Sequence, residues 1–441
     1  MKLALVGVGS AGARLVDRLV ALEGETGRNL SNGNVLVFDT AADGFADLEF
    51  VPESRRAVFG DTHPDIGPDG ADGDPDLGVT VAREDVHELR RAFDDLEFTE
   101  VDGAVLIAGL AGGTGGGAGA VLLEELQTIC EKPVYALGVL PAVDEPDRRA
   151  LNAARALPSF VDLADNVVLF DNEAWRSTLE YVELGADEDA DAAATADDTA
   201  ADATADENAD DQDGVGSQKA TGGEGGEEAT SLVDYDELNR VAASRLLSLF
   251  GAGELESMSI AENRADASDL ARTLETGGVS TIGQAELELD PAGARVPWLP
   301  IPSWLPAGLR TWLAGDAAEA GPTDAAKVNR LVRRAADGNL TLPCEIDSAD
   351  RALVVLSGPP DAVSRKGFES ARHWLERETD TVEVLAGDEP RPRASSLTAT
   401  VLLSNVTAVP RIDALQQRAV AAQDSLEDGD RETLEDGEFI W

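Results

Sequence analysis

The stretch Gly109–Gly119 reads GLAGGTGGGAG and directly follows the apolar run Gly103–Ala108. Seven of its eleven residues are glycine, and an apolar helical pattern over Val121–Leu126 comes next. This order predicts a strand, a glycine-rich loop and a helix. Without side chains in the way, successive backbone N–H groups can close around a phosphate, and the helix N-terminus adds its positive dipole end. We interpret the loop as a phosphate-binding element; tight strand–helix packing is the alternative.

A second glycine-rich loop, Gly7–Gly12, follows the apolar stretch Lys2–Val8 and precedes an amphipathic helical pattern. It matches the G-x-G-x-x-G fingerprint of dinucleotide-binding folds. Asp39, after the expected strand Val35–Phe38, stands roughly where such folds place a ribose-binding acid. An NAD-dependent oxidoreductase is therefore an alternative function, although it leaves the richer glycine loop unexplained.

Further segments place polar residues at the end of an expected strand or at the start of an expected helix. They are Gly70–Gly78 before a helix over Val79–Leu96, Glu145–Arg149 after a strand over Pro133–Leu140, Asp171–Ala174 after a strand over Val167–Phe170, and Tyr235–Arg240 opening a later helix. Strands and helices alternate up to about Glu183, which predicts a parallel sheet with helices on both faces.

In order, spacing and residue type, this succession resembles the tubulin/FtsZ superfamily. Within it, Gly277–Gly283, Leu340–Glu345 and Val409–Arg411 look like the second domain of the CetZ family of haloarchaea. The resemblance covers about residues 1–185 and 230–425. It implies an α/β fold with a parallel, Rossmann-like GTPase sheet, a central helix and a smaller α+β C-terminal domain.

The expected organisation has five parts along the chain. They are the first part of a GTP-binding domain (1–184), an acidic low-complexity insertion (185–230), the central helix and catalytic-loop region (231–276), the C-terminal α+β domain (277–427), and a flexible acidic tail with an apolar tip (428–441).

The resemblance implies a GTP site assembled from these segments. Asn172 and Asn239 would read the guanine edge, and Tyr235 would stack on the base. Glu145 would accept from the ribose hydroxyls, although Glu145 and Arg149 could equally form an ordinary i,i+4 ion pair. The expected nucleotide contacts are Gly9, Ser10, Ala11, Gly12, Ala13, Arg14, Ala71, Gly109, Gly112, Gly113, Thr114, Gly115, Glu145, Arg149, Asn172, Tyr235 and Asn239.

Phosphate charge has no Walker lysine to neutralise it, because no G-K-[ST] motif occurs in the chain. That role would fall to Mg²⁺ bound partly by the phosphates, with Arg149 contributing where geometry allows. No metal site made by the protein alone is expected.

The group that activates the attacking water is expected from a neighbouring subunit. By resemblance, Asp266 and Asp269 form the acidic loop that completes the next subunit's site. Their i,i+3 spacing puts both carboxylates on one side of a helical turn, where they could orient water or Mg²⁺. The alternative is that they cap a helix, and both interpretations can hold together. Arg264 stands where the family usually has Asn, which leaves the hydrolysis rate open.

The composition indicates a protein of concentrated salt. Acidic residues outnumber basic ones 85 to 35, giving a formal net charge of −50. In 1 M salt, screening over about 3 Å removes the self-repulsion of such a surface. Nucleic-acid binding is disfavoured because no basic patch exists. Cys130 and Cys344 are expected to be reduced thiols, and no signal peptide or membrane span is expected, so we predict a cytoplasmic protein.

Three segments fall outside a compact fold. Fifteen carboxylates and one lysine lie between Asp187 and Glu228, which predicts a solvated loop or a regulatory brush. The proline-broken segment Trp298–Trp312 holds three of the six tryptophans, and Phe439–Trp441 forms an apolar tip. Both could attach the protein peripherally to the inner membrane surface or to a partner groove; packing of the tryptophan segment into the core is the alternative.

The leading expectation is therefore a CetZ-like cytoskeletal GTPase. Identical subunits would associate head to tail into an open polymer, with a role in cell shape or motility. The alternatives are a nucleotide-binding scaffold that hydrolyses slowly or not at all, and the oxidoreductase.

Overall fold

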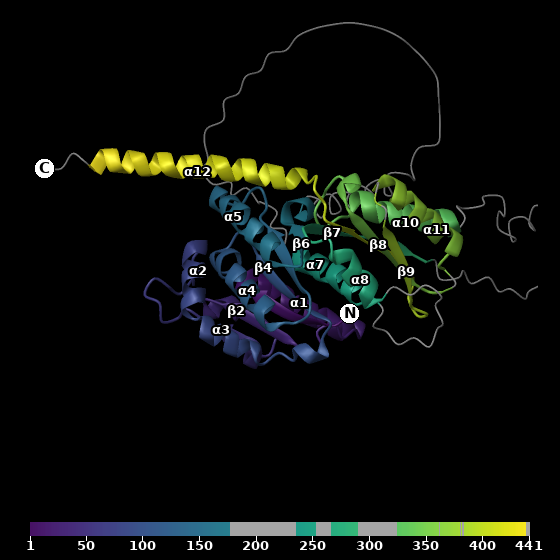
Figure 1. Cartoon of the computed structure of the whole chain (residues 1–441), viewed down its shortest axis with the longest axis horizontal. Coiled ribbons are helices and arrows are strands. Elements are labelled where there is room, and N and C mark those ends of the chain that lie inside the picture. The colour runs from purple at the N-terminus through teal and green to yellow at the C-terminus, as the bar shows by residue number, and fades with distance from the viewer. Residues whose placement is uncertain are drawn as a thin grey trace, which may run out of the picture.

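A single ten-stranded sheet organises the chain in a computed structural model (Figure 1). The structure describes residues 1–176, 235–252, 266–289, 324–360, 362–379, 381 and 383–437. The strand order is β3-β2-β1-β4-β5-β6-β7-β10-β8-β9. The α/β class predicted from the sequence is confirmed.

The elements have the following bounds. The strands are β1 (Leu3–Val8), β2 (Val35–Asp39), β3 (Arg56–Val58), β4 (Gly103–Gly109), β5 (Val134–Leu140), β6 (Asn166–Asp171), β7 (Val279–Glu288), β8 (Arg351–Gly358), β9 (Val384–Pro390) and β10 (Ser396–Ser404). The helices are α1 (Gly9–Thr26), α2 (Pro75–Glu84), α3 (Val86–Phe93), α4 (Gly119–Ile129), α5 (Asp147–Leu163), α7 (Tyr235–Phe250), α8 (Ala267–Leu274), α10 (Asp324–Gly338), α11 (Arg365–Glu378) and α12 (Pro410–Gly437).

The strands from β3 to β7 all run parallel, so their carboxyl ends share one edge of the sheet. That edge carries the glycine-rich segments after β1 and β4 and the polar segments after β5 and β6. In open parallel sheets, ligands bind beyond the carboxyl ends of the strands. The topology therefore gathers the predicted nucleotide segments on one side of the molecule.

Side-chain alternation along the strands builds one apolar core on each face of the sheet. In β1, Ala4, Val6 and Val8 join the core under α2 to α5, α10 and α11, whereas Leu3 and Leu5 join the core under α1, α7 and α8. These strands are buried on both faces, which explains their nearly continuous apolar runs.

The second part of the sheet continues the first. β7 pairs with β6 only through Val167↔Val279 and Val168↔Ser280, but with β10 over Thr281–Glu288. β10 is antiparallel to both β7 and β8, so β8 runs in the same direction as the N-terminal strands.

One long helix expected over Val79–Leu96 is wrong, because the structure has two helices, α2 and α3. α2 begins at Pro75, inside the expected loop, since the Asp74 side chain accepts from the backbone N–H groups of Asp76 and Leu77. The chain breaks at Asp85, whose carboxylate accepts from the distant Gly60 N–H at 2.6 Å.

The glycine-rich segments are less loop-like than predicted. α1 already begins at Gly9, and Thr114–Ala118 form a π-helical turn that leads into α4. A Cβ on Gly12 would lie 2.2 Å from the Ile107 carbonyl oxygen, and one on Gly115 would lie 2.4 Å from that of Gly109. Tight packing, the alternative considered for the Gly109–Gly119 loop, therefore accounts for Gly115, and a contact of the same kind accounts for Gly12.

The C-terminal helix α12 lies along α5 and projects beyond it (Figure 1). It continues through Gly437, so part of the tail predicted to be flexible from residue 428 is helical, in keeping with the high helix propensity of its Glu, Arg and Leu residues. Residues 185–230, Trp298–Trp312 and Phe439–Trp441 lie outside the described residues. Within the described part, no helix combines the length and apolar composition needed to cross a bilayer.

Candidate functional site

The two glycine-rich segments meet at the carboxyl edge of the sheet. A Cβ on Gly9, whose φ is +70°, would lie 3.0 Å from the Gly115 backbone nitrogen, and one on Gly109 would lie 2.9 Å from the Ala11 Cβ. Ser10 and Ala11 are exposed in the first turn of α1. Val8, at the N-cap of α1, offers no side-chain acceptor for the N–H groups of that turn. This end of α1 is therefore suited to receive an anion.

The remaining backbone of the glycine segment is partly open. A Cβ on Gly112 would meet no atom closer than the Gly109 oxygen at 3.8 Å, so the space beside Gly112 is free. Ala13, a predicted contact, is fully buried, so the structure does not present it to a ligand. Gly113 lies against the third segment, since its Cβ would be 2.9 Å from that of Ala71.

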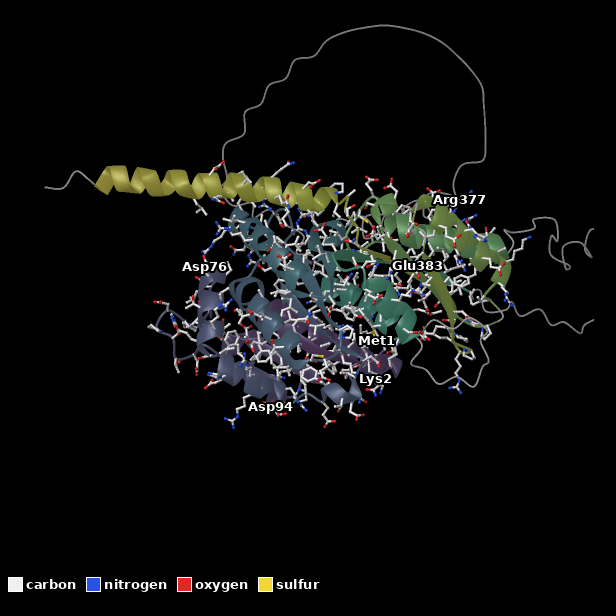
Figure 2. The ribbon with its side chains drawn as sticks, in the orientation of Figure 1. Met1, Lys2, Asp76, Asp94, Arg377 and Glu383 are labelled. Atoms are coloured by element: carbon white, nitrogen blue, oxygen red, sulfur yellow. The ribbon has the colours of Figure 1, made fainter. Side chains whose placement is uncertain are left out.

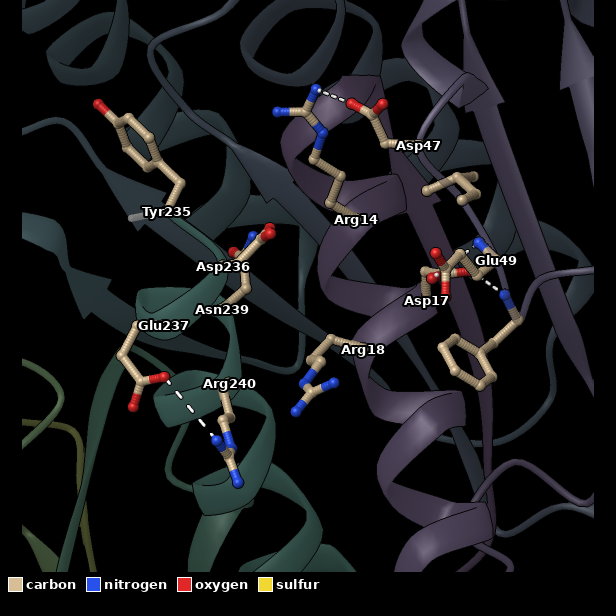
Figure 3. A pocket seen from close by; sticks show the side chains of 12 residues that line it. Arg14, Asp17, Arg18, Asp47, Glu49, Tyr235, Asp236, Glu237, Asn239 and Arg240 are labelled. Carbon is tan, nitrogen blue, oxygen red and sulfur yellow. Dashed lines mark hydrogen bonds and ion pairs between the residues drawn. The ribbon is translucent and has the colours of Figure 1, made fainter. Parts of the chain in front are cut away.

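A cavity of about 700 Å³ opens between α1 and α7 (Figure 3). Arg14 and Arg18 face it from α1, and Tyr235 and Asn239 face it from the first turns of α7. Its lining consists of Arg14, Asp17, Arg18, Asp47, Leu48, Glu49, Phe50, Tyr235, Asp236, Glu237, Asn239 and Arg240. The structure thus brings together three of the predicted contacts: an aromatic ring, an amide and a guanidinium group.

Glu145 and Arg149 lie near this cavity but are paired with each other. Arg149 Nη1 is 2.8 Å from Glu145 Oε2, the i,i+4 pair considered as an alternative, and Glu145 Oε1 accepts from the Ala142 N–H at 2.7 Å. Burial raises the pKa of the Tyr235 phenol; the negative charge of Glu145 adds to this effect, and the positive charge of Arg149 opposes it. To bind a ribose hydroxyl, Glu145 would have to accept it in addition to Arg149 and the Ala142 N–H.

Asn172 is buried at the carboxyl end of β6, and a long-range ion pair holds the residue before it. Arg411, at the start of α12, donates from Nε to Asp171 Oδ1 at 2.9 Å and from Nη2 to the Pro141 carbonyl at 2.6 Å. Burial raises the pKa of Asp171, whereas the charge of Arg411 lowers it. Arg411 therefore ties the carboxyl ends of β5 and β6 to the C-terminal helix.

Arg418, also on α12, stabilises the loop after β5. Its Nε lies 2.7 Å from Asp147 Oδ1, and Nη2 donates to the Glu145 carbonyl. Two arginines of α12 thus fix the segments that carry Asn172 and Glu145.

Asp39 is not presented as a ribose-binding acid would be. It is 5% exposed, and its Oδ1 accepts from the Thr40 N–H at 2.7 Å. Burial raises the pKa of Asp39, opposed by hydrogen bonds from the Thr40 and Ala41 N–H groups and the Thr114 hydroxyl. The strand order β3-β2-β1-β4-β5-β6 matches dinucleotide-binding folds, but this carboxylate is turned inward.

Asp266 and Asp269 form a capping box at the start of α8. Asp266 Oδ1 accepts from the N–H groups of Ser268 and Asp269, and Asp269 Oδ2 accepts from the Asp266 N–H at 3.3 Å. The capping alternative is therefore present. Within the described residues, these bonds use one oxygen of each carboxylate, so the cap does not prevent the other oxygen from serving a ligand.

This acidic pair lies at the sheet edge opposite the glycine segments. Asn166, the first residue of β6, donates to the carbonyls of Leu274, the last residue of α8, and of Gly277 after that helix. The hydrogen bond from the Ser268 side chain lowers the pKa of Asp266, and the charged N-terminus, before β1, acts in the same direction. Figure 2 places Met1 and Glu383, an ion-pair partner of Arg272 on α8, well away from Asp76 at the start of α2.

The described residues contain no group of three or more His, Cys, Asp or Glu side chains that could hold a metal ion.

Comparison with known proteins identifies both parts of the chain. Residues 2–180 match the GTPase domain of the tubulin/FtsZ family, and residues 228–421 match the C-terminal domain of tubulin-like CetZ proteins. The chain belongs to the CetZ family. Its N-terminal part is a tubulin/FtsZ-type GTPase domain, and the tubulin/FtsZ-like fold expected from the sequence is confirmed.

Individual CetZ proteins are similar over almost the whole chain. The tubulin-like protein CetZ3 of Haloferax volcanii is 40% identical over 426 residues, covering 96% of this chain and 92% of that protein. The GDP-bound monomer of CetZ1 from H. volcanii has a TM-score of 0.70 and 32% identity, covering 96% of this chain and 100% of that one. CetZ2 of the same organism, solved as a GTPγS-bound protofilament, has a TM-score of 0.71 and 28% identity, covering 97% and 100%.

Several residues around this CetZ site escaped the sequence interpretation. The sequence places Arg411 in a family motif without a role and gives no sign of Arg418. Asn152 donates to the carbonyls of Gly73 and Ala111 and so links two of the predicted phosphate segments. Their partners are distant in sequence, so no local pattern could have found them.

Proposed function

We propose that this CetZ-family chain binds GTP between subunits of a head-to-tail polymer and hydrolyses it there. Asp266 and Asp269 of one subunit would complete the site of the next. The observation that carries this proposal is the separation of the two half-sites on opposite edges of the sheet. A contact between unlike faces repeats without closing, which gives a filament.

The helix α7 supports this arrangement because it runs from one half-site to the other. Its first residues, Tyr235 and Asn239, line the cavity, and the carbonyl of its last residue, Phe250, accepts from the N-terminal ammonium of Met1 at 3.0 Å. Its 16 residues span about 24 Å. One subunit therefore cannot bring Asp266 or Asp269 to its own phosphates. The protofilament of the relative CetZ2 supports the same arrangement.

Within one subunit, the residues would act as follows. The first turn of α1 and the backbone of Gly112–Gly115 would hold the phosphates, with Thr114 adding a hydroxyl. Tyr235 would cover the base, while Asn172 and Asn239 would read it. Mg²⁺ would neutralise phosphate charge, since arginines near the cavity, such as Arg14 and Arg149, are already paired with carboxylates. The biological role proposed from family membership is control of cell shape or motility.

Asn239→Ala tests the assignment of the base. Loss of its hydrogen bonds should raise the Kd for GTP about tenfold and reduce the preference for GTP over ATP. Calorimetry with GTP and ATP in molar KCl measures both values. The same substitution at Asn329 on α10, remote in the fold, should change neither. Equal affinity of the unmodified protein for GTP and ATP would contradict the assignment of the base.

Peripheral membrane attachment remains a proposal based on sequence, because Trp298–Trp312 and Phe439–Trp441 lie outside the described residues. Aromatic and aliphatic side chains of this kind favour a bilayer interface. Joint replacement of Trp298 and Trp304 by Ser should abolish co-sedimentation with liposomes in high salt without lowering the melting temperature. If the unmodified protein never pellets, or the double variant unfolds, the tryptophan segment belongs to the core.

A further inference from the structure

Thr40 lies at the junction of three segments that surround the candidate phosphate site. It follows β2 directly, and it is 2% exposed. Its Oγ1 accepts from the Ala71 N–H at 3.1 Å and lies 2.7 Å from the Thr114 Oγ1. Thr40 was not among the residues predicted from the sequence, which singled out only the preceding Asp39 at the end of β2.

Counting hydrogens gives these contacts a direction. The Thr40 oxygen accepts from Ala71, so the single hydroxyl hydrogen of Thr40 can go to the Thr114 oxygen. Thr114 then keeps its own hydrogen for another acceptor. Without a nucleotide that hydrogen can point toward the Asp39 carboxylate, whose pKa the Thr114 hydroxyl lowers. A phosphate oxygen beside Thr114 would compete for the same hydrogen.

A bound phosphate would therefore strengthen the whole chain of hydrogen bonds. Burial disfavours the charged form of Asp39, and its carboxyl group already accepts from the Thr40 and Ala41 N–H groups, so a phosphate oxygen would be the stronger acceptor for the Thr114 hydrogen. When Thr114 donates to phosphate, its oxygen becomes a better acceptor for Thr40, and the Thr40 oxygen in turn becomes a better acceptor for the Ala71 N–H. Both threonines are buried, so water does not replace these bonds. The segment around Ala71 would be held most firmly when Thr114 contacts phosphate.

The strand order indicates which phosphate this is. Asn172 follows β6, Glu145 follows β5, the glycine segments follow β4 and β1, and Thr40 follows β2. Neighbouring strands lie about 4.8 Å apart, so the order of the strands sets the order of the nucleotide's parts along the sheet edge, from the base to the phosphates. With the base held beyond β6 and the phosphates against the glycine segments, the phosphate farthest from the base would lie closest to β2.

We propose that Thr40 is a positioning residue that couples the terminal phosphate of the bound nucleotide, through Thr114, to the segment around Ala71. The inference rests on the proposed function, because it takes the phosphates to lie against Thr114. Its consequence is that the Thr40 hydroxyl increases the affinity for a nucleoside triphosphate more than that for a diphosphate.

Thr40→Val, which keeps the shape but removes the hydroxyl, tests this in the full-length protein. We expect the Kd for GTPγS to rise about tenfold and that for GDP to stay within about twofold, because the buried Ala71 N–H loses its acceptor. Thr40→Ser keeps the hydroxyl and should show the wild-type ratio of the Kd for GTPγS to the Kd for GDP. Hydrogen exchange of the segment around Ala71 should be slowed by GTPγS in the wild type and in Thr40→Ser, but not in Thr40→Val.

The outcomes separate this inference from the proposed function. The role of Thr40 would be overturned if Thr40→Val weakened GTPγS and GDP binding equally, or if Thr40→Ser lost the wild-type ratio of the two Kd values. Either result would leave the proposal that the protein binds GTP unaffected. Failure of the unmodified protein to bind GTPγS would overturn the proposed function itself. If valine lowers the melting temperature, Thr40→Ala removes the same hydroxyl without crowding its neighbours and gives the same comparison.

Discussion

Asp269→Asn is expected to slow GTP turnover by about 10²- to 10⁴-fold while leaving GTP binding unchanged. In the proposed polymer this carboxylate acts on the nucleotide of the neighbouring subunit. It therefore does not contribute to nucleotide binding within its own subunit. Asparagine keeps an oxygen that can accept from the Asp266 N–H and thereby preserves the capping box. Phosphate release at saturating GTP measures the effect, and light scattering should show polymers that persist.

The matched control is Ser268→Ala. Ser268 lies between the two acids and donates to Asp266 Oδ1, but it carries no charge that could orient water. Its loss should change turnover by less than about tenfold, since it removes one exposed hydrogen bond. Specific turnover that does not depend on protein concentration would contradict an intersubunit site. Loss of nucleotide binding in Asp269→Asn would show that the acid only supports the fold.

The parallel half of the sheet could be predicted because its information is local. Apolar runs such as Val35–Phe38 and Gly103–Ala108 fill both faces of the sheet, and the glycine-rich segments mark the strand ends. The break between α2 and α3 could not be predicted, since it depends on the contact of Asp85 with Gly60, which is distant in sequence. A pattern of apolar residues contains no trace of such a contact.

The same distinction applies to the site. The resemblance to the tubulin/FtsZ superfamily was enough to predict Tyr235, Asn239 and Arg14, which the fold brings to one cavity. The hydroxyl of Thr40 and the guanidinium of Arg411 act through partners from other strands, with Arg411 reaching a carboxylate 240 residues away. Sequence reasoning finds groups that would face a ligand and misses those that hold them in place.

The buried pair of Arg28 and Glu389 is expected to be the largest electrostatic contribution to stability among the pairs discussed. Both side chains are 2% exposed, and Arg28 Nη2 is 3.0 Å from each carboxylate oxygen of Glu389. Arg28 Nη1 also donates to the Leu247 carbonyl at 3.0 Å. The pair thus joins the end of α1, the central helix α7 and strand β9.

Glu389→Gln should lower the free energy of unfolding by about 3–5 kcal/mol, because it leaves the charge of Arg28 buried without its counter-charge. Urea denaturation in molar KCl measures the change. Salt should not remove the effect, because buried pairs are screened far less than the acidic surface. The same substitution at Glu369, whose pair with Arg365 is more than 60% exposed on both sides, should cost about 0–1 kcal/mol.

A double variant, Arg28→Met with Glu389→Leu, separates the cost of an unpaired charge from the value of the pair. Apolar replacement of both partners should recover much of the stability lost in Glu389→Gln, since a well-packed apolar pair is often as stable as a buried ion pair. The neighbouring Ser357 and Arg391, which also bond to Glu389, would then lose their acceptor, so recovery should be incomplete. Equal costs at Glu389 and Glu369 would show that the pair contributes no more than a surface contact.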